Sequence, residues 1–380
     1  MRVLMVNSTL HIGGAEQVAA HIAQYLDRSR FDLTACYLKE NGVAGAQMQR
    51  GGVELVPIPG LRDKQRDYFT AFKLLRLIKQ RGIQLIHTHD LHGLMDGAVC
   101  RLLSPRLRHV HTFHWGNYPE REPRYARVEK LLWRVPDALV AVGHAQAAAI
   151  QSVYRIPADR MHVLWNGTDA SQSAICPEVA EALPPPGTPL IASISTLIPQ
   201  KGLSDLLLAA SALRQSGRRF LLMIIGQGKL RAQLESQAQE LGLGDVVKFL
   251  GWINEASQRA LPACDVFVQS SHWEAMSVVV LEAMAAGKPI AVTAVGENTR
   301  VVLDEETGLL VPPRDPNALA AALARLLDNP DLRSRLGASA ARRYEELFTV
   351  SHMVKRYEDL YAEMLAFDRS ALTRQVGVAG

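Results

Sequence analysis

The segment VFVQSSHWEAMSVVVLEAMAAGKPIAVTA, residues 266–294, contains the pattern that decides the fold. Its apolar runs at 266–271 and 289–294 predict two strands. Between them, Ser277 is suited to be the N-cap of a helix and Gly287 to end it. A strand, a helix and a second strand in this order are typical of a parallel sheet covered by helices.

The same alternation runs along nearly the whole chain. Further predicted strands lie at residues 2–7, 31–38, 53–59, 83–89, 108–114, 138–144, 161–167, 189–195, 220–226, 246–251 and 308–312. We therefore predict an α/β protein with two Rossmann-like, doubly wound parallel-sheet domains at 1–170 and 189–350. The proline-rich stretch 171–188 is the predicted linker, and a helical tail at 351–380 is expected to pack back toward the first domain. Ligands of such sheets bind beyond the carboxyl ends of the strands, so a central cleft between the domains is the expected site.

Composition excludes several classes of protein. The chain has 380 residues, of which 48% are hydrophobic and 21% charged, as in ordinary globular proteins. Its four cysteines are scattered without a C-x-x-C pair, which argues against a disulfide framework and a zinc site. The first residues do not resemble a signal peptide, and no apolar run reaches the ~20 residues of a membrane span. These observations predict a reduced, cytoplasmic protein.

Charge is distributed unevenly. Residues 1–170 contain 22 lysines and arginines against 15 acids, whereas the rest contains 20 against 23. The segment RDKQRDYFTAFKLLRLIKQRG, residues 62–82, concentrates the basic character in an amphipathic helical pattern. Such a helix is suited to peripheral contact with an anionic membrane. The alternative is an ordinary helix that packs on the sheet and exposes a basic face. We expect no nucleic-acid partner.

Two carboxylates flank the predicted helix start in the opening segment. Glu274 falls in the loop after the strand, and Glu282 falls on the second turn of the helix. The first-turn N–H groups between them attract an anion. A diphosphate at this position would have a sugar near Glu274 and a ribose near Glu282, since carboxylates accept hydrogen bonds from hydroxyls.

The chain resembles family 4 of the GT-B glycosyltransferases, the retaining group that uses nucleotide sugars. The most specific mark is Glu274-x7-Glu282 followed by AMAAGKP. Other motifs stand in the family's order: GGAE (13–16), HTFH (111–114), NGTD (166–169), LIPQKG (197–202), IIGQGKLR (224–231), VKFLGW (247–252) and TGLLVPPRD (307–315). The resemblance implies the GT-B fold, with the acceptor on the first domain and the donor on the second.

The resemblance also implies a role for each matching residue. Glu282 would bind the ribose, and Glu274 would contact the donor sugar. Lys201 would offset charge on the leaving phosphate, and His114 would lie near the sugar and the transferred proton. Gly13 and Gly14 would let the backbone approach a ligand. The remaining expected donor-binding residues are Gly226, Met276, Ser277 and Val278. The family works without a bound metal or cofactor, so none is expected.

Simpler interpretations remain open for several of these residues. Gly13 and Gly14 would then form only a tight turn, and Lys201 would be a solvated lysine at a helix start. One of the histidines in HTFH would belong to the core. His87 and His89 share a strand face, but a third metal ligand at Asp90 would point the other way.

The sequence departs from the family at three places. Ser195-Thr196 replaces the usual Gly-Arg, which removes a phosphate-binding cation; Arg300 and Lys229 are candidates to replace it. Ala275-Met276-Ser277 stands where relatives have a Gly-aromatic-Gly run. Gly296-Glu297 stands in place of Gly-Gly.

The resemblance thus implies a retaining, hexosyltransferase-type enzyme. It would move a sugar from a UDP- or GDP-linked donor to a hydroxyl of a glycan or lipid-linked acceptor in bacterial cell-surface polysaccharide or glycolipid synthesis. The alternatives are a GT-B binding or scaffold protein with impaired catalysis, and a GT-B nucleotide-sugar epimerase. The expected location is cytoplasmic, at the inner face of the plasma membrane if the 62–82 helix binds there.

Overall fold

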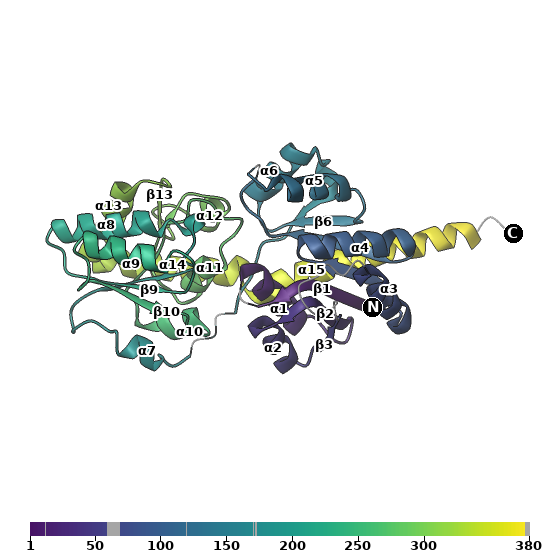
Figure 1. The fold of residues 1–380 in the computed structure, drawn as a ribbon, viewed down its shortest axis with the longest axis horizontal. Coiled ribbons are helices and arrows are strands. Elements are labelled where there is room, and N and C mark those ends of the chain that lie inside the picture. The colour runs from purple at the N-terminus through teal and green to yellow at the C-terminus, as the bar shows by residue number, and fades with distance from the viewer. Residues whose placement is uncertain (12, 59–68, 119, 170, 172, 377–380) are drawn as a thin grey trace. The chain divides into compact units, whose positions relative to one another are not determined.

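The computed structural model describes residues 1–11, 13–58, 69–118, 120–169, 171 and 173–376, with side chains described up to residue 366. Contacts divide the chain into two compact bodies. Unit 1 comprises Met1–Gly167 and Val350–Gly380, and unit 2 comprises Thr168–Thr349. Each unit has one sheet flanked by helices (Figure 1).

The sheet of unit 1 has the order β3-β2-β1-β4-β5-β6-β7, and its pairings are parallel. Its strands are β1 (Arg2–Leu10), β2 (Asp32–Asn41), β3 (Glu54–Pro57), β4 (Leu85–Thr88), β5 (Arg108–Phe113), β6 (Ala138–Ala141) and β7 (Met161–Val163). Its helices are α1 (Gly14–Tyr25), α2 (Val43–Arg50), α3 (Thr70–Arg81), α4 (Leu91–Leu103), α5 (Pro123–Leu132), α6 (His144–Tyr154) and α15 (Val350–Val376), with the 3-10 turn η1 (Ala158–Arg160).

The sheet of unit 2 has the order β10-β9-β8-β11-β12-β13, and its pairings are also parallel. Its strands are β8 (Leu190–Ile194), β9 (Leu221–Ile225), β10 (Val247–Gly251), β11 (Val266–Gln269), β12 (Ile290–Thr293) and β13 (Leu309–Val311). Its helices are α7 (Pro177–Ala180), α8 (Leu203–Gln215), α9 (Arg231–Glu240), α10 (Ala256–Ala260), α11 (Val278–Ala285), α12 (Asn298–Val301), α13 (Pro316–Asp328) and α14 (Pro330–Leu347), with the 3-10 turns η2 (Pro199–Lys201) and η3 (Leu261–Ala263).

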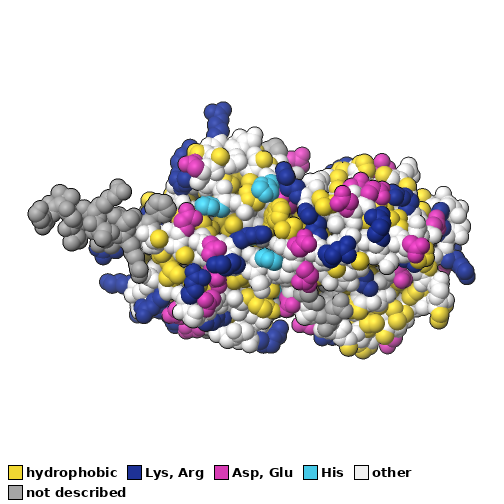
Figure 2. Space-filling view, turned by 180° about the vertical axis from the view of Figure 1, so that it is seen from behind, with side chains coloured by type: hydrophobic (Ala, Val, Ile, Leu, Met, Phe, Trp, Pro, Cys, Tyr) yellow, Lys and Arg dark blue, Asp and Glu magenta, His cyan; other side chains and the backbone are white. Residues whose placement is uncertain are grey.

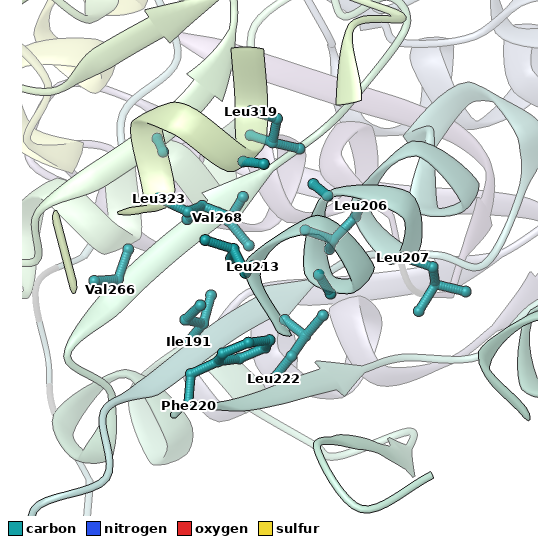
Figure 3. Close-up of a cluster of buried hydrophobic side chains, with 14 of the residues drawn as sticks. Ile191, Leu206, Leu207, Leu213, Phe220, Leu222, Val266, Val268, Leu319 and Leu323 are labelled. Carbon is teal, nitrogen blue, oxygen red and sulfur yellow. The ribbon is translucent and has the colours of Figure 1, made fainter. Parts of the chain in front are cut away.

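The predicted fold class is confirmed, and each predicted apolar run overlaps one of these strands. Continuous apolar strands are needed here because helices cover both faces of a parallel sheet. In unit 2, Leu206 and Leu213 of α8 and Leu323 of α13 pack against Val268 of β11 and Leu222 of β9 in one buried cluster (Figure 3). Burial of such side chains contributes about 1.5–3 kcal/mol each.

The C-terminal helix α15 belongs to unit 1, where it packs against α1. Tyr357 and Tyr361 are fully buried, and the Tyr361 hydroxyl lies 2.6 Å from Nδ1 of His87 on β4. The Glu358 carboxylate accepts a hydrogen bond from the backbone N–H of Asp27 at 2.8 Å. Residues 350 onward therefore help to build the core of the unit in which the chain begins.

The stretch 173–188 lies in unit 2, where it forms α7 and buries Cys176 and Val179. All four cysteines of the chain are buried free thiols. None of the helices in the described ranges has the length and apolar composition of a membrane span. Basic and acidic side chains are interspersed over the described surface seen in Figure 2.

Candidate functional site

In unit 2, the loop after β11 holds Glu274 beside a lysine. The Glu274 side chain is only 7% exposed, and its Oε1 lies 2.6 Å from Nζ of Lys201, at the end of η2. The Ser271 hydroxyl donates to the same carboxylate oxygen at 2.7 Å. A buried carboxylate needs such partners, because an unpaired charge in the interior is costly. Two residues expected in the site from sequence therefore form one ion pair.

Backbone contacts hold this loop against the turn after β12. Gly296 has a φ of 51°, and a Cβ atom at this position would lie 2.0 Å from the carbonyl oxygen of Glu274. Glu297, which follows it, is fully buried and donates its N–H to the Ala275 carbonyl at 3.1 Å. The first glycine of the expected Gly-Gly pair is thus required here by close approach, and Glu297 takes part in the packing.

Ser277 does begin α11, but it does not cap it with its side chain. Its hydroxyl instead accepts a hydrogen bond from Nε2 of Gln269 at 2.7 Å, and Gln269 Oε1 accepts one from Asn298. Ser277 is therefore the N-cap residue of α11, as expected, although its hydroxyl contacts a buried amide rather than the first-turn N–H groups. As expected, Gly287 ends the helix in the left-handed conformation, with a φ of 64°. Met276 and Val278 are buried, at 6% and 8% exposure.

Glu282 lies on the second turn of α11 and is half-buried. Its Oε2 accepts a hydrogen bond from the Ser257 hydroxyl at 2.5 Å. Burial raises the pKa of Glu282 to about 7, and the Ser257 bond opposes this shift. A small hollow beside it is also lined by Asp169, Ser171, Gln258 and Leu261. The carboxylate, hydroxyl and amide groups around this hollow are of the types that hydrogen-bond hydroxyls.

Gly226 follows β9 with a φ of 140°, and a Cβ atom there would meet the Ser195 carbonyl oxygen at 1.9 Å. The glycine is therefore required by packing against the loop that replaces the family's Gly-Arg. Thr196 in that loop is exposed. Of the two candidate replacement cations, Lys229 is exposed, and Arg300 lies 3.9 Å from the Glu297 carboxylate.

In unit 1, His114 directly follows β5. Its Nε2 lies 3.1 Å from Nδ1 of His89, and the two rings stack with centroids 5.4 Å apart. Burial lowers the pKa of His114 to about 4, although the charge of Asp90 opposes this shift. The imidazole is therefore neutral at pH 7, and it can donate or accept a hydrogen bond without carrying charge.

Gln146 holds the backbone on both sides of His114. Its Nε2 donates to the carbonyls of Phe113 at 3.1 Å and Trp115 at 2.6 Å, and its Oε1 accepts from the N–H of Val142 at 2.8 Å. Sequence reasoning missed this residue. The available signal was a lone amide on the alanine-rich inner face of α6, where it is 2% exposed.

His87 and His111 belong to a buried polar network of unit 1. His87 contacts Thr112 Oγ1 at 2.8 Å as well as Tyr361, so both of its ring nitrogens are engaged. His111 Nδ1 lies 2.8 Å from Thr88 Oγ1, which identifies it as the core histidine of HTFH. Asp90 caps α4 and accepts from Ser8. In the described residues, no group of three His, Cys, Asp or Glu side chains is arranged to hold a metal.

Gly13 and Gly14 lie at the start of α1. Gly13, the N-cap residue of α1, is extended, with a φ of 179°, a conformation that any residue adopts. A Cβ atom at Gly14 would have no neighbour within 4 Å. Packing within the described residues therefore does not require a glycine at position 14, and the expected approach of a ligand remains a prediction.

Comparisons with known proteins cover both units. A family model described as "Glycosyltransferase Family 4" matches residues 12–172, and one described as "Glycosyl transferases group 1" matches residues 178–343. Over 248 residues the chain is 31% identical to the lipopolysaccharide core biosynthesis glycosyltransferase LpsD of Rhizobium meliloti, covering 65% of this chain and 67% of that one. An uncharacterized glycosyltransferase of Methanocaldococcus jannaschii is 25% identical over 305 residues, covering 76% and 77%.

A solved structure supports the fold. Anabaena HepE in complex with UDP-glucose superposes with a TM-score of 0.83, covering 96% of this chain and 100% of that one at 21% sequence identity.

Proposed function

The chain belongs to glycosyltransferase family 4, and from this premise we propose that it moves a hexose from a nucleoside diphosphate sugar to a hydroxyl of a glycan or lipid-linked acceptor. The observation that carries the proposal is the arrangement at the start of α11. Lys201 and Glu274 form an ion pair before the helix, the first turn has no side-chain cap, and Glu282 follows on the second turn. A nucleoside diphosphate sugar carries its groups in the same order, with sugar hydroxyls, then the anionic diphosphate, then the ribose hydroxyls.

The ion pair gives Lys201 a defined part in this reaction. When a diphosphate binds at the uncapped helix start, the ammonium of Lys201 and the first-turn N–H groups face the charge that grows on the leaving phosphate. Glu274 accepts hydrogen bonds from Lys201 and Ser271, which makes it a poor nucleophile and a good acceptor for sugar hydroxyls. We therefore favour retention by attack on the same face as the leaving group, whose phosphate oxygen takes the acceptor's proton.

Unit 1 would contribute an uncharged hydrogen-bonding side chain. His114, uncharged at pH 7, is suited to hydrogen-bond a sugar hydroxyl near the reacting carbon without attracting the phosphate away from Lys201. In this proposal, side chains of unit 2 make the charged contacts with the diphosphate, and an uncharged side chain of unit 1 binds a sugar hydroxyl.

The test is donor turnover. The protein is incubated with UDP-glucose, which HepE holds in its structure, and with other UDP- and GDP-hexoses, with and without lipid-linked acceptor. We expect release of the nucleoside diphosphate and, by NMR, a product anomer with the donor's configuration. Inversion of the anomer would refute the retaining mechanism. Binding without turnover would favour a scaffold, and a new sugar isomer without release would favour an epimerase.

The proposed site of action is the cytoplasmic membrane surface, and helix α3 is the contact we infer. Phe69 and Phe72 at its start are 64% and 57% exposed, and Arg76 and Lys79 are exposed on the same helix. The neighbouring helix α4 exposes Leu102 at 67%. Apolar side chains beside basic ones suit an anionic bilayer surface. Residues 62–68 of the predicted basic segment lie outside the described residues.

Cosedimentation with anionic liposomes checks this contact. We expect binding at low salt that weakens as salt is raised, and a several-fold loss for the double variant Phe69→Ser, Phe72→Ser. Leu208→Ser removes a 41% exposed apolar side chain from α8 of unit 2 and is the matched control. If the wild-type protein stays in the supernatant, α3 only covers the sheet.

A further inference from the structure

A hollow in unit 1 has not entered the proposed reaction. It is lined by His144, Val163, Trp165 and Arg356. His144 is the first residue of α6, Val163 is the last of β7, and Trp165 follows that strand. Arg356 comes from α15. The hollow therefore lies at the carboxyl ends of parallel strands, where ligands of doubly wound sheets bind.

Arg356 is the unusual member of this group. Its guanidinium carbon lies 5.7 Å from the centre of the Trp165 ring, and the side chain is half-buried. Burial lowers its pKa, and no acidic side chain contributes to offset this shift. Across the part of the chain that the structure describes, no carboxylate forms an ion pair with it. A partly desolvated cation without a counter-charge is unfavourable unless an anion from outside compensates it.

A second arginine of unit 1 shows what a purely structural arrangement looks like. The guanidinium carbon of Arg121 lies 4.8 Å from the ring centre of Trp115, much as Arg356 lies over Trp165. Arg121, however, also binds the Glu129 carboxylate at 2.9 Å, and Glu129 is 3% exposed. The arginine of the Arg121–Trp115 pair thus has a carboxylate partner, whereas the Arg356–Trp165 pair faces a hollow.

We propose that this hollow is a subsite for a sugar ring that carries an anionic group, a phosphate or a carboxylate. The guanidinium of Arg356 would bind the oxygens of that group in its planar fork, and the face of Trp165 would pack against the ring. The exposed His144 offers one more polar contact at the rim. That this sugar is part of the acceptor rests on the proposed function, whereas the binding itself does not.

The experiment measures binding of glucose 6-phosphate, glucuronate and glucose by calorimetry, with UDP present to fill the donor site. We expect one or both anionic sugars to bind, and neutral glucose to bind at least tenfold more weakly. The two anionic probes distinguish phosphate from carboxylate. Arg356→Gln should weaken the preferred probe by roughly tenfold or more, the scale of a lost charge-assisted hydrogen bond. Arg356→Lys should retain part of the affinity, because it keeps the charge without the planar fork.

Two further variants locate the binding. Lys355→Gln removes the neighbouring cation on α15, which is 60% exposed and lies 2.6 Å from Asp359, and should bind as the wild type does. Trp165→Phe keeps an aromatic face but removes the indole. It should still bind the sugar, and a fluorescence titration should show a smaller change in tryptophan emission on binding than in the wild type.

Three results would overturn the proposal: no binding of either anionic sugar, equal binding of glucose, or unchanged affinity in Arg356→Gln. Failure of the proposed function would look different. UDP would then not bind to unit 2 and no donor would turn over, whereas the anionic sugars would still bind through Arg356.

Discussion

The two units differ in the charge of their candidate side chains: Lys201 and Glu274 of unit 2 form an ion pair, whereas His114 of unit 1 is a neutral imidazole. Lys201 and Ser271 both donate hydrogen bonds to the Glu274 carboxylate. His114 contacts His89, and burial lowers its pKa to about 4 although the charge of Asp90 opposes the shift. The contrast suggests that unit 2 binds the charged leaving group and that unit 1 forms hydrogen bonds with sugar hydroxyls. If so, removing charge should act on unit 2 and removing a hydrogen bond on unit 1.

The largest effect should follow from Lys201→Met. Loss of the cation at the leaving phosphate should lower kcat by about 10²–10³, the cost of removing one such stabilising donor. Steady-state kinetics with the preferred donor measures this. Lys201→Arg, which retains the charge, should recover part of the rate. A near-normal rate in the Met variant would assign the leaving-group charge to another residue, and the comparison between the units would fail.

A smaller loss is expected for His114→Ala. Since the imidazole is neutral, its removal should lower kcat by about 10² while leaving the affinity for UDP nearly unchanged. Kinetics and calorimetry separate the two quantities. The exposed His352→Ala is the control for loss of a histidine. Equal losses of UDP affinity and rate would show that His114 binds the nucleotide and that unit 1 is not restricted to neutral recognition.

Gln146→Leu tests whether the backbone around His114 must be held in place. We expect kcat to fall by roughly tenfold with UDP affinity unchanged, because the variant acts only through the position of His114. Stability should fall by about 1–3 kcal/mol for each buried backbone group left unpaired. Gln146→Glu keeps an oxygen that can accept the hydrogen bond from the Val142 N–H, but it lacks the N–H groups that donate to the carbonyls of Phe113 and Trp115. A loss of stability without a loss of rate would make Gln146 structural alone.

The smallest effect should be the pH dependence of nucleotide binding. Because the pKa of Glu282 is raised from 4.5 to about 7, its carboxylate becomes protonated as the pH falls below 7. UDP-glucose, whose doubly esterified diphosphate does not titrate in this range, should therefore bind several-fold more weakly at pH 6 than at pH 8 in the wild type, and its affinity should stay flat over that range in Glu282→Gln. Calorimetry at fixed ionic strength measures this. Glu240→Gln, exposed on α9, should behave as the wild type does.

The same raised pKa has a consequence for stability with a definite sign. The folded state holds more protons than the unfolded state between pH 4.5 and pH 7, so Glu282 destabilises the fold as the pH rises through this window. Relative to Glu282→Gln, the wild type should lose free energy of unfolding between pH 4.5 and pH 7. Urea unfolding of both proteins across this range is the measurement, and an opposite slope would contradict the burial of this carboxyl group.

Patterns local in sequence predicted most of the fold. The strands were visible because both faces of each sheet are buried, which leaves continuous apolar runs such as 190–194. The positions of Glu274 and Glu282 followed from the helix start at Ser277 and the stop at Gly287. Family motifs then supplied roles that spacing alone does not indicate.

Contacts between distant residues account for what was not predicted. The Ser277 hydroxyl contacts Gln269 rather than the first turn of α11, and the reach of that amide depends on how β11 and the loop pack. Gln146 acts through carbonyls more than 30 residues earlier in the chain, with no motif to mark it. The hollow at Arg356 exists only because α15 returns to unit 1.

That return of α15 also sets the order in which the protein can be completed during synthesis. Unit 2 is one continuous stretch whose ends, Thr168 and Thr349, meet in a β-bridge, so it can finish folding as soon as it has left the ribosome. Synthesis of unit 1 begins first, but its fold is completed last, because His87 contacts Tyr361, which lies 274 residues later in the chain. A nascent chain paused near residue 349 would therefore contain a folded unit 2 while the histidine core of unit 1 is still incomplete.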